Sequence, residues 1–268
     1  MKILQIPNYD VQNNQVSLSF RSTNRAYYDK TVKDSYLSGI VSNYTFPFRD
    51  DFDDWFGNID FILNNFKNKK NINIYSLGCS DGSEPYSIGI ALIKSNMPDA
   101  KKVRSIIATD IDRDILELAK SGKINLSYEN ISRIKELLGE NQDYFYDEKD
   151  KLKMPEKWKP SIRMLETDDY RSYKVKEELF KMIKYREENI LETVNSIKDD
   201  SNTFVACRNT IPYLSIKNQK LFLHLLSLKL KKNSMVAIGE FDKQINLANK
   251  LMEEHFAPTK IRNLFIKL

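Results

Sequence analysis

The stretch Ile72-Asn-Ile-Tyr-Ser-Leu-Gly-Cys-Ser-Asp-Gly-Ser-Glu-Pro85 holds the features that decide the fold. Its first six residues are mostly apolar, which predicts a buried strand. A short polar loop with two glycines follows, and Pro85 then favours the first turn of a helix, where a missing N–H costs little. Glycine is scarce, with eight in 268 residues, yet Gly78, Gly82 and Gly89 fall close together. A chain so poor in glycine is expected to place it where the backbone needs it.

Strands and helices alternate around this stretch. Helical spacing of apolar residues predicts helices at 50–66, 84–94, 112–121, 131–138, 216–230 and 244–255. Short apolar runs predict strands at 72–77, 103–109, 203–207, 234–239 and 263–268. This alternation is typical of an α/β protein with a doubly wound, Rossmann-like sheet.

Residues 123–188 interrupt the alternation. The segment is charged and contains aromatic residues such as Tyr144 and Trp158, whose side chains need a surface to pack on. Residues Tyr170–Arg186 alternate in a way that suggests one or two strands. We therefore interpret about 123–188 as a small inserted subdomain and not as a linker.

Composition excludes several classes of protein. The 42 basic and 37 acidic residues give a net charge of +5, but both signs are mixed along the chain, which is typical of a solvated surface and not of a nucleic-acid interface. The two cysteines, Cys79 and Cys207, form no CxxC pair, and the two histidines lie apart from both, so we expect reduced thiols, no disulfide and no metal site. The sequence has neither a signal peptide nor an apolar run long enough to span a membrane, which predicts a cytoplasmic protein.

Two common phosphate-binding loops do not fit the glycine loop. The dinucleotide pattern G-x-G-x-x-G fails because three residues separate Gly78 from Gly82, and the phosphate loop GxxxxGK[ST] fails because no lysine follows Gly82. The first turn of the helix instead carries Glu84. A carboxylate there would repel a pyrophosphate but would suit a cationic or hydroxyl-bearing ligand. This favours S-adenosylmethionine over NAD or ATP.

Two further groups of polar residues follow predicted strands. Asp110 and Asp112 come after the strand at 103–109, where an acidic residue can accept hydrogen bonds from ribose hydroxyls or can cap the next helix. We favour the ligand for Asp110 and the cap for Asp112. The turn Cys207-Arg-Asn-Thr-Ile-Pro-Tyr213 follows the strand at 203–207, which in a doubly wound sheet lies beside the first strand, where ligands bind.

Four motifs in this order resemble the CheR family, which are S-adenosylmethionine-dependent methyltransferases acting on glutamates of chemotaxis receptors. They are Asn43-Tyr-Thr-Phe-Pro-Phe-Arg49, Ser76-Leu-Gly-Cys-Ser-Asp-Gly-Ser-Glu-Pro-Tyr-Ser87, Thr109-Asp-Ile-Asp112, and Cys207-Arg-Asn with Tyr213. They are similar to the family patterns N-x-T-x-F-F-R, A-A-x-S-x-G-E-E-P-Y-S, S-D-I-D and C-R-N-x-x-x-Y. The resemblance covers about residues 40–268 and implies a class I methyltransferase fold.

The resemblance also implies which residues bind S-adenosylmethionine and its product S-adenosylhomocysteine. Asn43, Thr45 and Arg49 would hold the methionine end, with Arg49 near its carboxylate. Gly78 would allow close approach of the backbone, and Glu84 would bind the cofactor.

Further along the chain, the family's pattern implies that Asp110 binds the ribose. Asn189 and Ile190 resemble a family motif that flanks the adenine, and Arg208 and Asn209 would line the active site.

The chemistry expected of the family suits these residue types. A carboxylate is already a nucleophile, so methylation needs alignment and exclusion of water more than a strong base. Arg208 could hold the incoming carboxylate through paired N–H donors, and Tyr213 could face the sulfonium. Arg49, Arg208 and Tyr213 are therefore the expected catalytic residues.

Departures from the family pattern bear on the substrate. Ser83 stands where the family has glutamate, and Pro212 where it has an aliphatic residue. We expect residues 1–48 to form a shortened N-terminal region and 49–268 the methyltransferase domain. The family's N-terminal domain helps to recognise receptors, and the inserted subdomain of some members docks onto a receptor tail.

These departures leave the methyl acceptor open. The expected partner is a protein, such as a chemoreceptor or another signalling protein. The alternatives are a methyltransferase of nucleic acid or a small molecule, and a non-catalytic module that keeps the fold.

Overall fold

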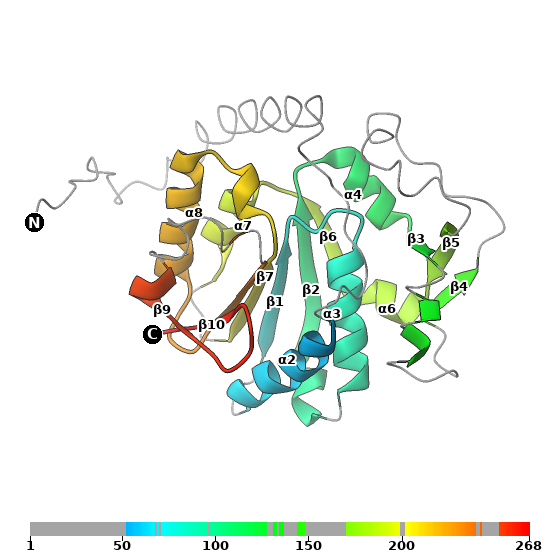
Figure 1. The fold of residues 1–268 in the computed structure, drawn as a ribbon, viewed down its shortest axis with the longest axis horizontal. Coiled ribbons are helices and arrows are strands. Elements are labelled where there is room, and N and C mark those ends of the chain that lie inside the picture. Colours follow the sequence, from blue (N-terminus) through cyan, green and yellow to red (C-terminus); the bar gives the residue numbers. More distant parts are fainter. Residues whose placement is uncertain are drawn as a thin grey trace, which may run out of the picture.

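Seven strands form the central sheet of the computed structural model (Figure 1). The structure describes residues 52–67, 69, 71–95, 97–127, 131–132, 134–136, 144–147, 170–198, 202–239, 242 and 252–268. In spatial order the strands are β6 (Ile183–Glu187), β2 (Val103–Asp110), β1 (Ile72–Leu77), β7 (Thr203–Cys207), β8 (Met235–Ile238), β10 (Leu264–Lys267) and β9 (Phe256–Pro258).

The winding of the sheet reverses between β1 and β7. The chain passes from β1 to β2 and then to β6 on one side, whereas β7 and β8 extend the sheet on the other side. These five strands are parallel, and β10 is antiparallel to both of its neighbours. The predicted doubly wound α/β fold is therefore confirmed. In such sheets the ligand binds at the carboxyl ends of the strands, where the winding reverses.

Helices cover both faces of the sheet (Figure 1). One layer contains α2 (Phe52–Asn65), α3 (Ser83–Lys94) and α4 (Arg113–Lys120), and the other contains α7 (Ile190–Ser196) and α8 (Ile216–Lys229). Two 3₁₀ turns, η1 (Pro98–Lys102) and η3 (Ile211–Tyr213), complete the connections to β2 and α8.

The side chains of β7 show how the two cores form. Phe204 and Ala206 pack into the core under α2 and α3, while Val205 and Cys207 pack into the core under α7 and α8. Alternate side chains of a strand point to opposite faces, so a strand with apolar residues at every position is buried on both faces.

A second sheet lies beside the first (Figure 1). It consists of β3 (Lys123–Ser127), β5 (Tyr170–Val175) and β4 (Phe145–Asp147), with β5 paired to both others in antiparallel fashion. The segment Tyr170–Arg186, predicted as one or two strands of the insertion, is divided among β5, α6 (Glu177–Lys181) and β6. Of these, β6 belongs to the central sheet, where it pairs with β2.

The helices predicted at 131–138 and 244–255 lie partly outside the described residues. The other predicted elements differ little from the observed ones. Most boundaries shift by one or two residues, because the ends of helices are set by caps that apolar spacing does not show. The strands β3, β4 and β9 were not predicted, since runs of three to five residues carry too little pattern. Cys79 and Cys207 are buried free thiols, and burial raises the pKa of each well above its usual value. Within the described ranges, no helix combines the length and apolar character needed to cross a membrane.

Candidate functional site at the switch point

The glycine loop after β1 turns back onto the end of β2. The N–H groups of Gly78 and Cys79 both donate to the carbonyl oxygen of Thr109, at 2.8 and 2.9 Å. Gly78 has a φ of +72°, a conformation that side chains disfavour. A Cβ there would lie 2.8 Å from Oγ1 of Thr210, in the turn after β7. Gly78 is therefore required both by its backbone and by the packing of a second loop.

The carboxylate of Asp110 joins the glycine loop to the turn after β2. Its Oδ2 accepts a hydrogen bond from the N–H of Ser80, and its Oδ1 accepts one from the N–H of Asp112, each at 2.9 Å. The side chain of Asp112 accepts from the N–H of Asp114 and caps α4, so the capping alternative favoured for Asp112 is confirmed. Asp110 thus lies at the carboxyl end of β2 and shapes the loop of β1.

The turn after β7 is held between β1 and β8. The hydroxyl of Thr210 donates to the carbonyl oxygen of Leu77 at 3.3 Å, which brings Arg208 and Asn209 to the end of the first strand. Asn209 has a φ of +56°. The tight 3₁₀ turn η3 follows and contains the half-buried Tyr213.

Asp242 is a part of this site that the sequence analysis missed. Its carboxylate accepts hydrogen bonds from the N–H groups of Asn209, Ile211 and Gly239. The available signal was an aspartate three residues after Gly239, just beyond the strand predicted at 234–239. That spacing is common around helix caps and did not distinguish Asp242 from an ordinary cap.

Acidic side chains lie near the glycine loop and the turn after β7. The hydroxyl of Ser76, a buried residue of β1, donates to Oε1 of Glu84 at 2.7 Å. Glu84 and Asp110 together raise the pKa of Cys79, and Glu84 also raises the pKa of Asp242, so these carboxylates act on the same region. Negative charge at this edge of the sheet favours a cationic or hydroxyl-bearing ligand.

Burial raises the pKa of Asp110 and of Asp242 to about 6, against the opposing effect of their backbone N–H partners. The unfolded chain would have values near 3.9. Each group therefore stabilises the fold below about pH 4, and this contribution is lost as the pH rises through about 6.

The variant Asp110→Asn tests this linkage. Its free energy of unfolding relative to wild type should increase by about 2 kcal/mol between pH 4 and pH 7.5, since each pKa unit corresponds to about 1.4 kcal/mol. Urea unfolding over a pH series measures the difference, and Asp114→Asn controls for the loss of one negative charge. A difference that stays constant with pH would contradict the raised pKa.

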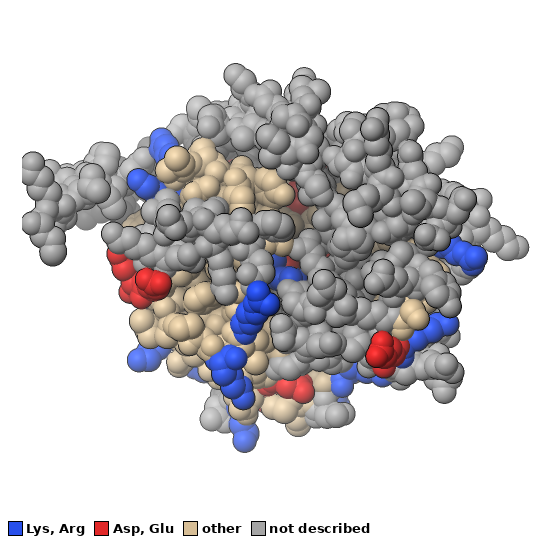
Figure 2. All heavy atoms as spheres, viewed as in Figure 1, with Lys and Arg blue, Asp and Glu red and all other residues tan. Residues whose placement is uncertain are grey.

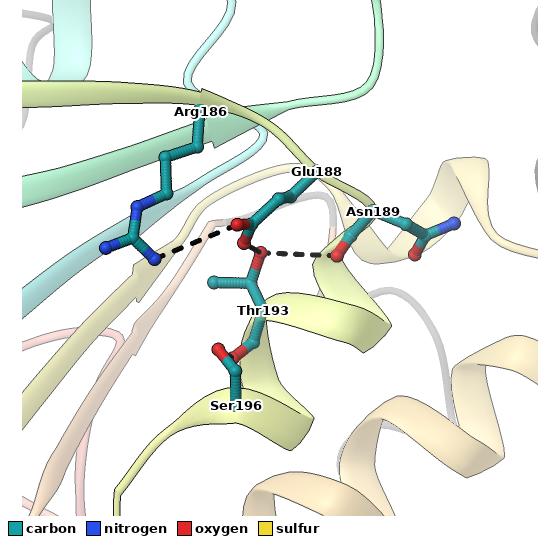
Figure 3. Close-up of polar contacts among 5 residues, drawn as sticks. All are labelled: Arg186, Glu188, Asn189, Thr193 and Ser196. Carbon is teal, nitrogen blue, oxygen red and sulfur yellow. Dashed lines mark hydrogen bonds and ion pairs between the residues drawn. The ribbon is translucent and has the colours of Figure 1, made fainter. Parts of the chain in front are cut away.

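The segment after β6 carries Asn189 (Figure 3) and Ile190, the two residues expected beside the adenine. The N–H of Glu188 donates to the carbonyl oxygen of Asp110 at 3.1 Å, which brings the segment to the end of β2. Oδ1 of Asn189 accepts from the N–H of Leu191 at 2.9 Å and caps α7, and Ile190 is buried in the core under that helix. Both residues thus have a structural role, and only the backbone around them is shown to lie near Asp110.

Side-chain contacts fix this segment in place (Figure 3). The hydroxyl of Thr193 lies 3.1 Å from Oε2 of Glu188 and 3.2 Å from the carbonyl oxygen of Asn189. Arg186 pairs with Glu188 at 3.8 Å, with both side chains partly in water. The side-chain amide of Asn189 points away from Thr193.

The structure therefore brings several of the expected site residues to one edge of the sheet. Gly78, Asp110 and the turn that contains Arg208 and Asn209 are connected by hydrogen bonds and packing, as described above. Asn43, Thr45 and Arg49 lie outside the described residues, and their roles stay predictions.

The described surface has no single charged patch on the face drawn in Figure 2. Basic side chains occur at separate places, with acidic side chains among them. Among the described residues, no three histidine, cysteine, aspartate or glutamate side chains form a group that could hold a metal ion.

Comparison with known proteins identifies one family. A family model described as CheR methyltransferase, SAM binding domain, matches residues 49–168 and 135–260. The chemotaxis protein methyltransferase Cher2 of Pseudomonas putida (strain KT2440) is 26% identical over 212 residues, which cover 77% of this chain and 62% of that protein. The chemotaxis protein methyltransferase of Borreliella burgdorferi (strain B31) is 27% identical over 216 residues, 76% of this chain and 65% of that protein.

The chain spans about three fifths of the length of these curated relatives. Among solved structures, the N-methyltransferase NodS from Bradyrhizobium japonicum WM9, in complex with S-adenosyl-l-homocysteine, is 9% identical. The match covers 87% of this chain and 98% of that chain, with a TM-score of 0.42.

Proposed function

The chain belongs to the CheR methyltransferase family and carries its S-adenosylmethionine-binding domain, and we therefore propose that it transfers a methyl group to a glutamate carboxylate of a protein. One observation carries the proposal. The glycine loop, Asp110 and the turn after β7 meet where the winding of the sheet reverses, which is where such folds bind ligands.

The residues at this edge of the sheet suit the cofactor. When bound, S-adenosylmethionine supplies an electrophilic methyl group on a sulfonium cation. Glu84 provides a negative charge for a cationic ligand, and Asp110 provides acceptor oxygens for ribose hydroxyls at the end of β2. Gly78 holds the glycine loop against the end of β2, and its backbone would approach the cofactor. Asn189 and Ile190, at the segment next to Asp110, would flank the adenine.

The acceptor would enter from the side of the turn after β7. A glutamate carboxylate is ionised at neutral pH and needs no general base. Arg208 would orient it through two N–H donors, and the half-buried ring of Tyr213 would face the cationic centre. Arg49 would complete the catalytic set at the methionine end. The chain's contribution is alignment and the exclusion of water.

The proposed acceptor is a signalling protein, such as a chemoreceptor. The support is that the relatives are named chemotaxis protein methyltransferases. The proposed location is the cytoplasm, where the methylated segments of such receptors would be accessible to the enzyme.

The stability of the label to base tests the proposal. Incubation with methyl-labelled S-adenosylmethionine and a cell extract should give labelled protein that releases methanol in mild base, because methyl esters hydrolyse there. Base-stable label would indicate another acceptor, such as an amine, and would contradict carboxylate methylation. Binding of S-adenosylhomocysteine without any label would favour a non-catalytic module.

The variant Arg208→Lys tests the role given to the guanidinium. Lysine keeps the charge but loses the paired donor geometry, so the initial rate of methylation should fall about tenfold. The affinity for S-adenosylhomocysteine, measured by calorimetry, should change by less than about threefold. Arg104→Lys, on the exposed amino half of β2, is the matched control. An unchanged rate would contradict this role.

A further inference from the structure

Asp242 is a buried carboxylate behind the turn that follows β7, and its exposure is 0%. Three backbone donors converge on it. The N–H groups of Asn209 and Gly239 donate to Oδ2 at 2.6 Å each, and the N–H of Ile211 donates to Oδ1 at 3.0 Å. Hydrogen bonds to an ionised acceptor are stronger than neutral ones, so this carboxylate ties the turn to the end of β8.

The turn has little room to adopt another shape. Asn209 has a positive φ, and the hydroxyl of Thr210 connects the same turn to Leu77 of β1. A Cβ on Gly239 would lie 2.6 Å from the backbone nitrogen of Asn209 and would collide with its side chain. The turn is thus confined between the ends of β1 and β8, and Asp242 supplies the acceptors for its inward-facing N–H groups.

A buried charge by itself seldom increases the free energy of unfolding. Burial and the nearby charge of Glu84 raise the pKa of Asp242, while the three N–H groups lower it. Removing an ion from water costs free energy, and an apolar core of the same volume is often as stable. Geometry accounts for the carboxylate of Asp242, because it satisfies three donors that an apolar side chain would leave unpaired.

We infer that Asp242 is a positioning residue, which sets the backbone of the Arg208–Asn209 turn for binding of the cofactor. The inference rests on the proposed function of that turn. Asp242 acts through the backbone that surrounds it and is not itself proposed to touch the ligand.

The test compares two isosteric aspartate variants. Asp242→Asn keeps the volume but turns an NH₂ group towards backbone donors, so the dissociation constant for S-adenosylhomocysteine should rise about tenfold, with an unchanged far-UV circular dichroism spectrum. Asp99→Asn is the matched control, since Asp99 is also buried but pairs with Lys102 near the amino end of β2. Its dissociation constant should stay within about twofold of wild type.

A double-mutant cycle separates positioning from general stability. Asn209→Gly removes the Asn209 side chain but tolerates the positive φ and keeps the N–H that Asp242 binds. If Asp242 sets the turn so that the Asn209 side chain reaches the ligand, Asp242→Asn should cost less than about threefold in affinity in the Asn209→Gly background, because the side chain that the turn positions is then absent. Additive losses would overturn the inference, since they would indicate a purely structural effect.

The other outcomes distinguish failure of the proposed function from failure of the inference about Asp242. If wild type does not bind S-adenosylhomocysteine, the proposed function fails before Asp242 is tested. If wild type binds it and Asp242→Asn binds equally well, only the inference about Asp242 fails. Should Asp242→Asn not fold, Gly239→Ala displaces the same turn with the carboxylate intact, and it should weaken binding about tenfold. Unchanged affinity of Gly239→Ala would overturn the inference.

Discussion

We expect Asp110→Ala to weaken the binding of S-adenosylhomocysteine about 100-fold at pH 7.5. The substitution removes the acceptor proposed for the ribose hydroxyls. It also leaves the N–H groups of Ser80 and Asp112 without their acceptor, so the glycine loop loses its connection to β2. Hydrogen bonds to charged groups contribute about 1.5–3 kcal/mol each, and about 2.7 kcal/mol corresponds to 100-fold in affinity.

Calorimetry with S-adenosylhomocysteine measures this effect directly. Asp112→Ala is the matched control, because Asp112 lies two residues away and its side chain caps α4. That variant should lose about 1 kcal/mol of stability but keep its affinity within about threefold. Unchanged affinity of Asp110→Ala would refute the role given to Asp110, and absence of binding by wild type would refute the site itself.

The second large effect is expected for Gly78→Ala, which should lower the free energy of unfolding by about 3 kcal/mol. A side chain at a φ of +72° costs about 1 kcal/mol, and the new Cβ would lie 2.8 Å from Oγ1 and 2.9 Å from Cγ2 of Thr210. Relief of this collision must move the glycine loop or the turn after β7. The affinity for S-adenosylhomocysteine should therefore fall at least about tenfold.

The chain contains a matched control for the backbone contribution. Gly122 has a φ of +69°, but a Cβ there would lie 3.5 Å from the ring of Phe180, which is an ordinary contact. Gly122→Ala should thus cost about 1 kcal/mol and leave affinity unchanged. Thr210→Ala should rescue part of the loss in Gly78→Ala, since it removes both atoms of the collision. Equal urea-unfolding losses in the two glycine variants would contradict the predicted collision.

Most strands of the central sheet could be predicted from the sequence, because each is a short run of apolar residues. The strands at 72–77 and 203–207 have apolar residues on both faces, and the structure places them side by side at the centre of the sheet. The edge strand β6, which follows β1 and β2 in chain order within the central sheet, was predicted to belong to the insertion. Pairing with β2 is a contact between distant segments, and the pattern of five residues does not specify it.

The candidate site could be predicted only in part, because some of its contacts join residues that are distant along the chain. Residue types at strand ends indicated Asp110 and the turn at Arg208, and these do lie near the first strand. The cap formed by the Asn189 side chain and the three donors that meet at Asp242 depend on the path of the backbone in space. An aspartate or asparagine near a helix start has the same local pattern whether it caps, positions or binds.

The sequence alone determined the α/β class, the glycine loop between the first strand and its helix, and the resemblance to one methyltransferase family. These follow from apolar periodicity and short motifs, which act within about twenty residues of chain. The tertiary structure decided that Gly78 must be glycine because Thr210 packs against it, and that a buried Asp242 holds the turn of Arg208. Gly78 and Thr210 are more than a hundred residues apart along the chain, and Asp242 and Asn209 are about thirty residues apart. Only the folded sheet brings each pair into contact.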